Sequence, residues 1–183
     1  MFLMVFTMYF SGGLIPTYLV IRQLGLLNSF WVMILPTAIV TYNLIVMRTF
    51  FATTIPKELL ESGFIDGAGN FRILLTIVLP LSSPVIAVVG LFYAVGHWNA
   101  FFNALIYLRD SALYPLQLIL RDILLQSMVE DVGTDSLGMQ EQVLISEGIK
   151  YAIILISSLP VILMYPFVQK YFVKGVMVGS IKG

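Results

Sequence analysis

The stretch ILLTIVLPLSSPVIAVVGLFYAVGHWNAFFNALIYL, Ile73 to Leu108, contains 36 residues without one Asp, Glu, Lys or Arg. The hydrocarbon core of a bilayer, about 30 Å thick, requires about 20 helical residues. Because the run is longer than this, Pro80 and Pro84 predict a short leading segment before a span from about Ser83 to Leu105. A continuous apolar run also differs from the alternating strands of a membrane β-barrel, so the span should be a helix.

The rest of the chain contains further uncharged runs of spanning length, at Met1–Ile21, Gln23–Met47 and Tyr151–Gln169. The sequence is 59% hydrophobic and 11% charged, whereas soluble domains are about 25% charged. Met1–Phe10 lacks the basic start of a signal peptide and continues to spanning length. We therefore predict an all-α, polytopic transmembrane bundle with about four spans, forming a single domain over residues 1–183.

Several classes of function lack the residues that they need. The absence of cysteine excludes disulfides and thiolate metal sites, and the net charge of zero indicates no nucleic-acid partner. His97 alone is a poor metal site. All ten acidic residues fall in loops or at their edges, which disfavours an enzyme embedded in the membrane. No G-x-x-x-x-G-K-[ST] motif is present, so we expect no nucleotide or other cofactor on this chain.

The charges predict which loops face the cytoplasm. With four spans, the connection Arg48–Ser82 and the tail from Lys170 share one side, and the connections Ile21–Ser29 and Leu105–Lys150 share the other. The first side holds six Lys and Arg residues against four on the second, and the richer side is normally cytoplasmic. Aromatic rings near the predicted outer ends of the spans agree with this orientation. They are Trp31, Trp98, Tyr107 and Tyr151.

The cytoplasmic loop, residues 53–80, is predicted to form a helix, a turn and a second helix. Thr53 or Thr54 could cap a helix that runs over Pro56–Asp66, with its acidic residues near the positive end of the helix dipole. The Asp66-Gly67 pair predicts a turn with positive φ, and a second helix runs from Asn70 to Pro80. From the residues alone, this loop could equally be a solvated segment that lies on the lipid headgroups.

The spacing in this loop resembles the E-A-A loop of permease subunits in ABC importers. That pattern reads E-A-A, three residues, G, nine residues, I-x-L-P. It is matched by Glu61-Ser62-Gly63, Gly67, Ile77 and Leu79-Pro80, with Ser62 and Gly63 in place of alanines. Further stretches resemble carbohydrate-importer permeases of the maltose-permease type, in the branch associated with oligosaccharides and polyuronates. They are IPTYLVIRQLGLLNSFWVMILP, GHWNAFFNALIYL and YPFVQKYFVKGVMVGSIKG.

The resemblance implies a fold, a set of partners and a role for the loop. Such permeases usually have six spans, so this sequence resembles the last four, with Met1 within the third. The implied partners are ABC ATPase subunits that bind the ATP, a second permease subunit, an extracytoplasmic solute-binding protein and a sugar, at a bacterial inner membrane. The loop would couple ATPase movement to alternating access. The implied coupling residues are Glu58, Leu60, Glu61, Gly63, Phe64, Asp66, Gly67, Ala68, Ile77, Leu79 and Pro80.

Polar and aromatic residues within spans are candidates for the substrate path, because such groups usually face the bundle interior or a water path. They are Tyr42, Asn43, Tyr93, Trp98, Asn99 and Asn103. Asn99 and Asn103 are four residues apart and are expected to share a helix face beside Trp98, where amides and a ring could bind a sugar. Alternatively, the amides bridge neighbouring helices and Trp98 belongs to the aromatic belt.

The extracytoplasmic loop, residues 107–150, is the longest polar stretch. Pro115–Ser127 predicts an amphipathic helix, and residues 129–142 predict an irregular acidic loop. The resemblance implies that this face meets the solute-binding protein, and a solvated loop is the alternative. Two other functions stay open here: an ABC permease for a solute other than sugar, and an ATP-independent secondary transporter.

Overall fold

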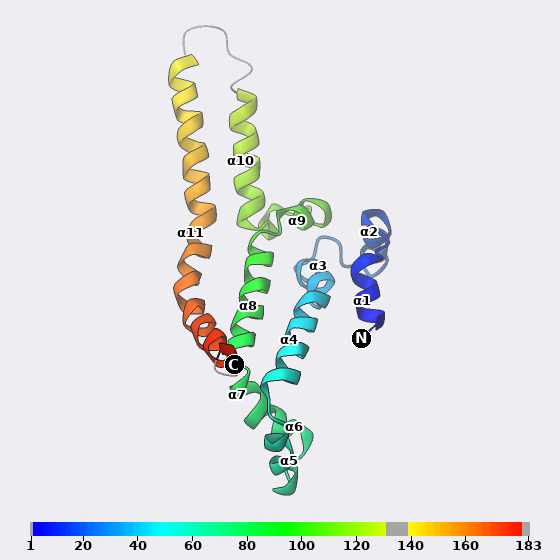
Figure 1. The fold of residues 1–183 in the computed structure, drawn as a ribbon. Helices are drawn as coiled ribbons and strands as arrows, with labels where there is room; N and C mark the ends of the chain where they lie inside the picture. The colour runs from blue at the N-terminus through cyan, green and yellow to red at the C-terminus, as the bar shows by residue number, and fades with distance from the viewer. Residues whose placement is uncertain (1, 131–138, 181–183) are drawn as a thin grey trace. The chain divides into compact units, whose positions relative to one another are not determined.

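The computed structural model of the protein describes residues 2–130 and 139–180. Within these residues the chain forms helices joined by short turns, and no strand occurs (Figure 1). The predicted all-α fold is therefore confirmed. The chain divides into two compact units, which are described separately. The first unit comprises Met1–Gly12, Thr37–Tyr93 and Pro166–Gly183, and the second comprises Gly13–Pro36 and Ala94–Tyr165.

The helices of the first unit include those of the loop predicted to be cytoplasmic. They are α1 (Phe2–Tyr9), α4 (Thr41–Thr54), α5 (Lys57–Ile65), α6 (Asn70–Ile73), the π-helical turn η2 (Leu74–Val78), α7 (Leu79–Leu81) and most of α8 (Ser83–Trp98). Those of the second unit are α2 (Leu14–Gln23), α3 (Trp31–Ile34), α9 (Phe101–Tyr107), η3 (Ser111–Leu113), α10 (Leu116–Glu130) and most of α11 (Met139–Ser180). The 3-10 turn η1 (Leu35–Thr37) lies where the two units meet in the sequence.

In the first unit, a tyrosine joins α8 to the segment before α4. Residues 38–40 lie between helical elements, so their backbone groups lack the partners that a helix supplies. The Tyr93 hydroxyl accepts a hydrogen bond from the Val40 N–H at 3.0 Å and donates one to the Ala38 carbonyl at 3.2 Å. The hydroxyl of one tyrosine thus supplies hydrogen-bond partners for a carbonyl and an amide group of the non-helical segment 38–40.

The second unit is organised around a small apolar core and one asparagine. The buried core residues are Ile21, Val32, Ala104, Tyr107, Leu108 and Leu118. Asn28 has φ of 56°, a conformation that asparagine tolerates better than most residues. Its side-chain Oδ1 accepts hydrogen bonds from the N–H groups of Arg109 at 2.9 Å and Asp110 at 2.8 Å. The α2–α3 turn is thereby fixed to the end of α9.

The apolar helices are long enough to cross a membrane in only some cases. Among the described residues, the part of α11 over Glu147–Pro166 qualifies as a span by itself. Three broken helix pairs qualify only if each pair is counted as one span: Phe2–Tyr9 with Leu14–Gln23, Trp31–Thr37 with Thr41–Thr54, and Asn70–Leu81 with Ser83–Trp98. Counting them in this way gives up to four. The four-span topology therefore stays a prediction.

Two element boundaries predicted from the sequence are wrong. The third predicted span begins at Ser83 as expected, but α8 ends at Trp98 and not near Leu105. In the acidic stretch 129–142, residues 129–130 belong to α10 and residues 139–142 to α11, so these parts are helical and not irregular; residues 131–138 lie outside the described part. The helix predicted over Pro115–Ser127 is confirmed by α10.

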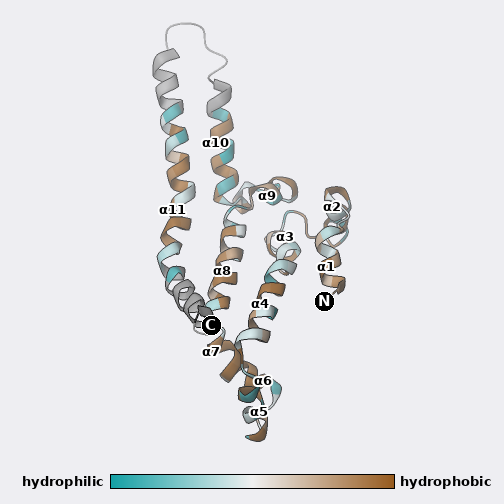
Figure 2. Cartoon of the chain, in the orientation of Figure 1, coloured by the Kyte–Doolittle hydropathy of each residue, from teal (hydrophilic) through white to brown (hydrophobic). Residues whose placement is uncertain are grey.

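The surface of the helices is largely apolar where the chain is expected to meet lipid. Figure 2 shows apolar residues over much of α8, whereas polar and apolar turns alternate along α10. On α11, large apolar side chains such as Ile154, Leu155 and Leu163 are exposed. An aqueous protein rarely exposes a contiguous surface of this kind, whereas hydrocarbon accommodates it without cost.

Candidate functional site

The predicted coupling helix corresponds to α5 and begins directly after Pro56. Pro56 is extended, with ψ of 138°, and serves as the N-cap without a side-chain hydrogen bond. The predicted caps Thr53 and Thr54 instead form the last turn of α4, and the Thr53 hydroxyl donates to the Thr49 carbonyl at 2.9 Å. The cap prediction was wrong because both threonines belong to α4, which ends at Thr54. Glu58 lies in the first turn of α5, as expected.

The end of α5 is fixed by a Schellman motif. The Ala68 N–H donates to the Gly63 carbonyl at 2.9 Å, and the Gly67 N–H donates to the Phe64 carbonyl at 3.0 Å. This pair of bonds places Gly67 in the left-handed region, where its φ is +75°. The prediction of a positive φ at the Asp66-Gly67 pair is therefore confirmed for Gly67.

Gly63 is the point at which α5 packs against the following segment. It is buried, and a Cβ placed on it would lie 3.2 Å from Ile73 Cγ1 and 3.3 Å from Ile77 Cδ1. Contacts this short require the neighbouring side chains to shift. Figure 1 shows α5 and α6 side by side at this contact. The third position of the E-A-A pattern thus faces Ile77, a later position of the same pattern.

The exposed side chains of α5 and of its C-cap residue include acidic and apolar ones. Glu58, Glu61 and Asp66 are exposed, and no ion pair to these carboxylates occurs among the described residues. Phe64 is 54% exposed and Ile65 is 85% exposed. Leu60 and Ala68 are partly buried. A folded helix that offers unpaired carboxylates beside uncovered apolar side chains is suited to a groove on another protein.

The segment after the turn leads to the span through an irregular helix. The predicted helix Asn70–Pro80 is present, but it consists of α6, the π turn η2 and α7, which ends at Leu81. The π turn had no recognisable sequence signal. Leu79 and Pro80 are exposed on α7. The helix axis then bends by 80° before α8.

The bend lies at Ser82, between the two prolines that were predicted to cause it. Its side chain is fully buried, and its hydroxyl has no hydrogen-bond partner among the described residues. Its backbone N–H donates to the carbonyls of Val78 at 3.0 Å and Leu79 at 3.1 Å. Pro80 and Pro84 lie on either side of this residue. The break between α7 and α8 therefore falls between the two prolines.

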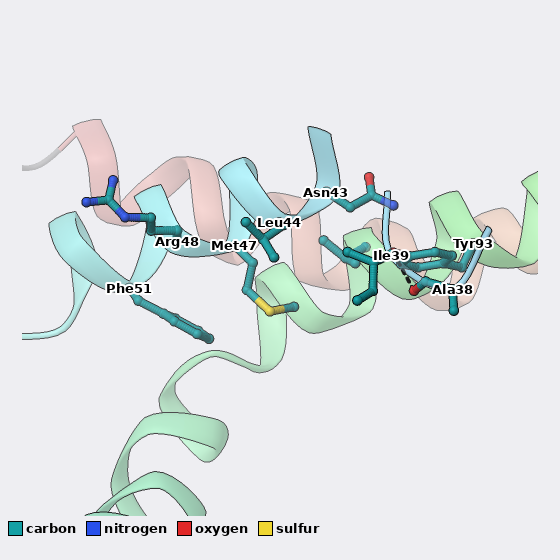
Figure 3. Close-up of a pocket in the computed structure, with 9 residues that line it drawn as sticks. Ala38, Ile39, Asn43, Leu44, Met47, Arg48, Phe51 and Tyr93 are labelled. Atoms are coloured by element: carbon teal, nitrogen blue, oxygen red, sulfur yellow. Dashed lines mark hydrogen bonds between the residues drawn. The ribbon is translucent and has the colours of Figure 1, made fainter. Parts of the chain in front are cut away.

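Two of the predicted substrate-path residues line one cavity in the first unit (Figure 3). Asn43, which is 5% exposed, and Tyr93 belong to a cavity of about 390 Å³. The other lining residues are Ala38, Ile39, Leu44, Met47, Arg48, Phe51 and Val89. Most of this lining is apolar, and the Tyr93 hydroxyl is already bonded to the backbone. The cavity therefore offers few free groups to a polyhydroxylated ligand.

Tyr42 lies outside that cavity. It is 54% exposed, and its ring lies against Phe92 with centroids 6.5 Å apart. The structure therefore separates Tyr42 from Asn43 and Tyr93, although the three were grouped by sequence.

Asn99 and Asn103 do not share a helix face, so that prediction is wrong. Asn99 follows the end of α8, and Asn103 lies on α9, which begins at Phe101. The Asn99 side chain donates to the Val95 carbonyl at 3.0 Å, and Ala100 departs from helical geometry with ψ of 40°. An asparagine side chain that binds a backbone carbonyl competes with helix continuation, which explains the break.

Asn99 instead lines a cavity in the second unit, which we call the polar cavity, together with three other polar side chains. This cavity, of about 330 Å³, is lined by Asn99, Gln117, Ser157, Ser158, Val161 and Ile162. Beside it, the Trp98 indole Nε1 donates to the Ser157 carbonyl at 2.9 Å and ties α8 to α11. Sequence analysis missed Gln117, Ser157 and Ser158; a pair of serines inside an apolar run was the available signal. The described residues contain no group of three metal-binding side chains.

Residues 1–178 match the family of binding-protein-dependent transport system inner membrane components. The chain belongs to this family. The family comprises components of transport systems and not enzymes, and its members are located in the inner membrane. The resemblance identified from the loop around Glu61 is thereby confirmed.

The individual relatives of this chain in the transport family are longer than the chain itself. Protein LplC of Bacillus subtilis (strain 168) is 50% identical over 181 residues, which are 99% of this chain and 60% of LplC. The polygalacturonan/rhamnogalacturonan transport system permease protein YtcP of the same organism is 50% identical over 185 residues, covering 100% of this chain and 63% of YtcP. The melibiose/raffinose/stachyose import permease protein MelC is 28% identical over 173 residues, covering 93% of this chain and 57% of MelC. The chain thus spans about 60% of the length of these relatives. No solved structure matches it.

Proposed function

We propose that the chain is a permease subunit of an ATP-driven, binding-protein-dependent importer of oligosaccharides, and that α5 couples the movements of the ATPase to the spans. The observation that carries this proposal is that α5 has one side packed against its own chain and another side exposed. One side is held by Gly63 and the Schellman motif at Gly67. The other side presents Glu61 and Phe64 without partners of their own among the described residues.

The proposed mechanism is transmission through a rigid contact. ATP binding and hydrolysis take place on separate ATPase subunits, and a groove on each receives one coupling helix. The docked partner can shift the inward-open and outward-open states only through its different affinity for them. The contact of Gly63 with Ile73 and Ile77 links α5 to the segment that leads into α8. Movement of α5 would therefore reach a membrane-spanning helix.

The family and the relatives support the other parts of the system. A binding-protein-dependent component requires an extracytoplasmic solute-binding protein, and we propose that this protein docks near α10. A second permease subunit would complete the pathway across the bilayer. The name of YtcP refers to polygalacturonan and rhamnogalacturonan, and that of MelC to melibiose, raffinose and stachyose. We propose an oligosaccharide as the cargo, in preference to a solute of another class or to ion-driven transport without ATP.

The proposal is tested by changing each side of α5. We expect Glu61→Lys to abolish sugar-stimulated ATP hydrolysis, because it reverses a charge on the docking face without disturbing the packing of the helix. We expect Gly67→Pro to do the same, because proline cannot adopt φ of +75°. The measurement is ATPase activity of the reconstituted transporter, with membrane insertion confirmed by immunoblot.

A matched control is available in the same loop. Gly69→Ala changes a glycine with φ of −72° and open space around its Cβ position. This variant should retain stimulation. Normal transport by Glu61→Lys or Gly67→Pro would refute the coupling role of α5.

A further inference from the structure

We propose that the polar cavity of the second unit is a contact site for uncharged ring hydroxyls of the transported sugar. Its binding groups are the side chains of Asn99, Gln117, Ser157 and Ser158. This inference rests on the importer function proposed above and adds a site and a ligand chemistry to it. It also differs from the sequence prediction, which grouped Asn99 with Asn103.

The site is assembled from three elements that are distant in sequence. Asn99 directly follows α8, Gln117 lies in the first turn of α10, and the two serines lie on α11. The Trp98 indole fixes α8 to α11 by its 2.9 Å bond to the Ser157 carbonyl. Because that bond uses a backbone acceptor, the Ser157 hydroxyl is not consumed by it. The volume of about 330 Å³ is at the lower end of the range for small-molecule sites.

The hydrogen bonds within the site leave several groups for a ligand. The Ser157 and Ser158 hydroxyls donate to the Ile154 carbonyl at 3.1 Å and 2.6 Å, so their oxygen lone pairs are free to accept. The Asn99 amide uses one N–H on the Val95 carbonyl and retains a second N–H and its carbonyl oxygen. Gln117 adds an amide with both donors and an acceptor. A sugar hydroxyl, which donates and accepts, matches this set.

The charge of the site selects which part of a sugar it can bind. Among the described residues, its lining contains no Lys, Arg, Asp or Glu. A uronate carboxylate placed there would find no cation to pair with. Neutral hydroxyls need no such partner and can bond to the amides and hydroxyls that are present. The site therefore fits a neutral ring, or the neutral ring of a mixed oligosaccharide.

The location of the serines argues against a purely structural role. They lie in the middle of Glu147–Pro166, the stretch of α11 whose mean hydropathy is 1.8. Polar side chains in such a stretch normally face the bundle interior or a water path. The link between α8 and α11 is already made by Trp98, so the hydroxyls are not needed for it. The two hydroxyls thus lie beside the cavity and the tryptophan, with their lone pairs available to a ligand.

The test compares two glutamines in the assembled transporter, with its ATPase and binding protein in nanodiscs. The probes are a galacturonate–rhamnose disaccharide, which has one neutral ring, and a galacturonate disaccharide, which has none. We expect Gln117→Leu to raise the KM of sugar-stimulated ATP hydrolysis for the mixed disaccharide about five- to tenfold, the effect of losing one or two hydrogen bonds. Ser158→Ala should raise it less, and Gln23→Leu, at the exposed end of α2, should not change it.

A second measurement reports on the site directly. Trp31→Phe leaves Trp98 as the sole tryptophan of this chain, and tryptophan-free partner subunits make its fluorescence specific. The mixed disaccharide should shift Trp98 emission, and Gln117→Leu should move the half-maximal concentration in parallel with KM. An unchanged KM and an unchanged emission shift in Gln117→Leu would overturn the site alone. Absence of any sugar stimulation in the unmodified transporter would instead overturn the importer function.

Discussion

Gly63 illustrates how one residue can have a different role from the one its family pattern suggests. In the sequence it replaces an alanine of the E-A-A pattern, and glycine has a lower helix propensity than alanine. In the structure it is buried against Ile73 and Ile77. Gly67 in the same loop is required for another reason, its φ of +75°. Spacing predicted the role of Gly67, because a turn has a local signal, but it could not predict a contact made ten residues later.

We predict that Gly63→Val separates α5 from the segment that follows it. A valine cannot fit beside two isoleucines at 3.2–3.3 Å, and overpacking of this kind costs about 1–3 kcal/mol. Sugar-stimulated ATP hydrolysis should fall, while Gly69→Ala, which meets open space, should behave as the unmodified protein.

A second substitution on the facing segment should partly reverse the effect of Gly63→Val. Shortening the facing side chain in the double variant Gly63→Val with Ile77→Ala should restore part of the stimulation. If the double variant were no better than Gly63→Val alone, the contact would not be what transmits movement.

At the scale of elements, the sequence located helices better than it located their breaks. The amphipathic pattern of α10 and the Schellman end of α5 were visible as periodicity and as glycine placement. The break at Ser82 was also signalled, by Pro80 and Pro84, whereas the break at Asn99–Ala100 was not, because no proline of the uncharged run lies beside it. In hydrocarbon, a helix and a broken helix can have the same composition. Side-chain to backbone bonds, such as that from Asn99 to Val95, decide between them.

We predict that Ser82→Ala stabilises the protein slightly. The Ser82 hydroxyl is fully buried and forms no hydrogen bond within the described part of the chain, and an unsatisfied buried group costs about 1–3 kcal/mol. Removing it should raise the unfolding temperature in detergent. Ser83→Ala, at the exposed neighbouring position, provides the comparison and should leave this temperature unchanged. A clear decrease for Ser82→Ala would mean that the hydroxyl has a partner in the assembled protein.

At the scale of the whole molecule, composition was sufficient for the fold class and the loop motif was sufficient for the family. The number of spans was not determined in either way. Four uncharged runs in the sequence correspond to one continuous helix of spanning length and three broken pairs among the described residues. The positive-inside count of six against four favours one orientation.

We predict the sidedness of the chain from labelling of single cysteines, for which a protein without native cysteine is suitable. Ser62→Cys, on exposed α5, should react with a membrane-impermeant maleimide only in inverted vesicles. Ser111→Cys, on exposed η3, should react in intact spheroplasts. The reverse pattern would invert the topology and place α5 out of reach of any ATPase.

The phenol of Tyr93 joins two main-chain groups, and this has a consequence for how the protein can evolve. Since the partners at positions 38 and 40 are a carbonyl and an amide of the backbone, almost any residue except proline at 40 would preserve them. At position 93 the side chain itself makes both bonds. Even phenylalanine there would leave the two backbone groups without their hydrogen-bond partner. Over generations, therefore, substitutions should accumulate on one side of this junction while the other stays fixed.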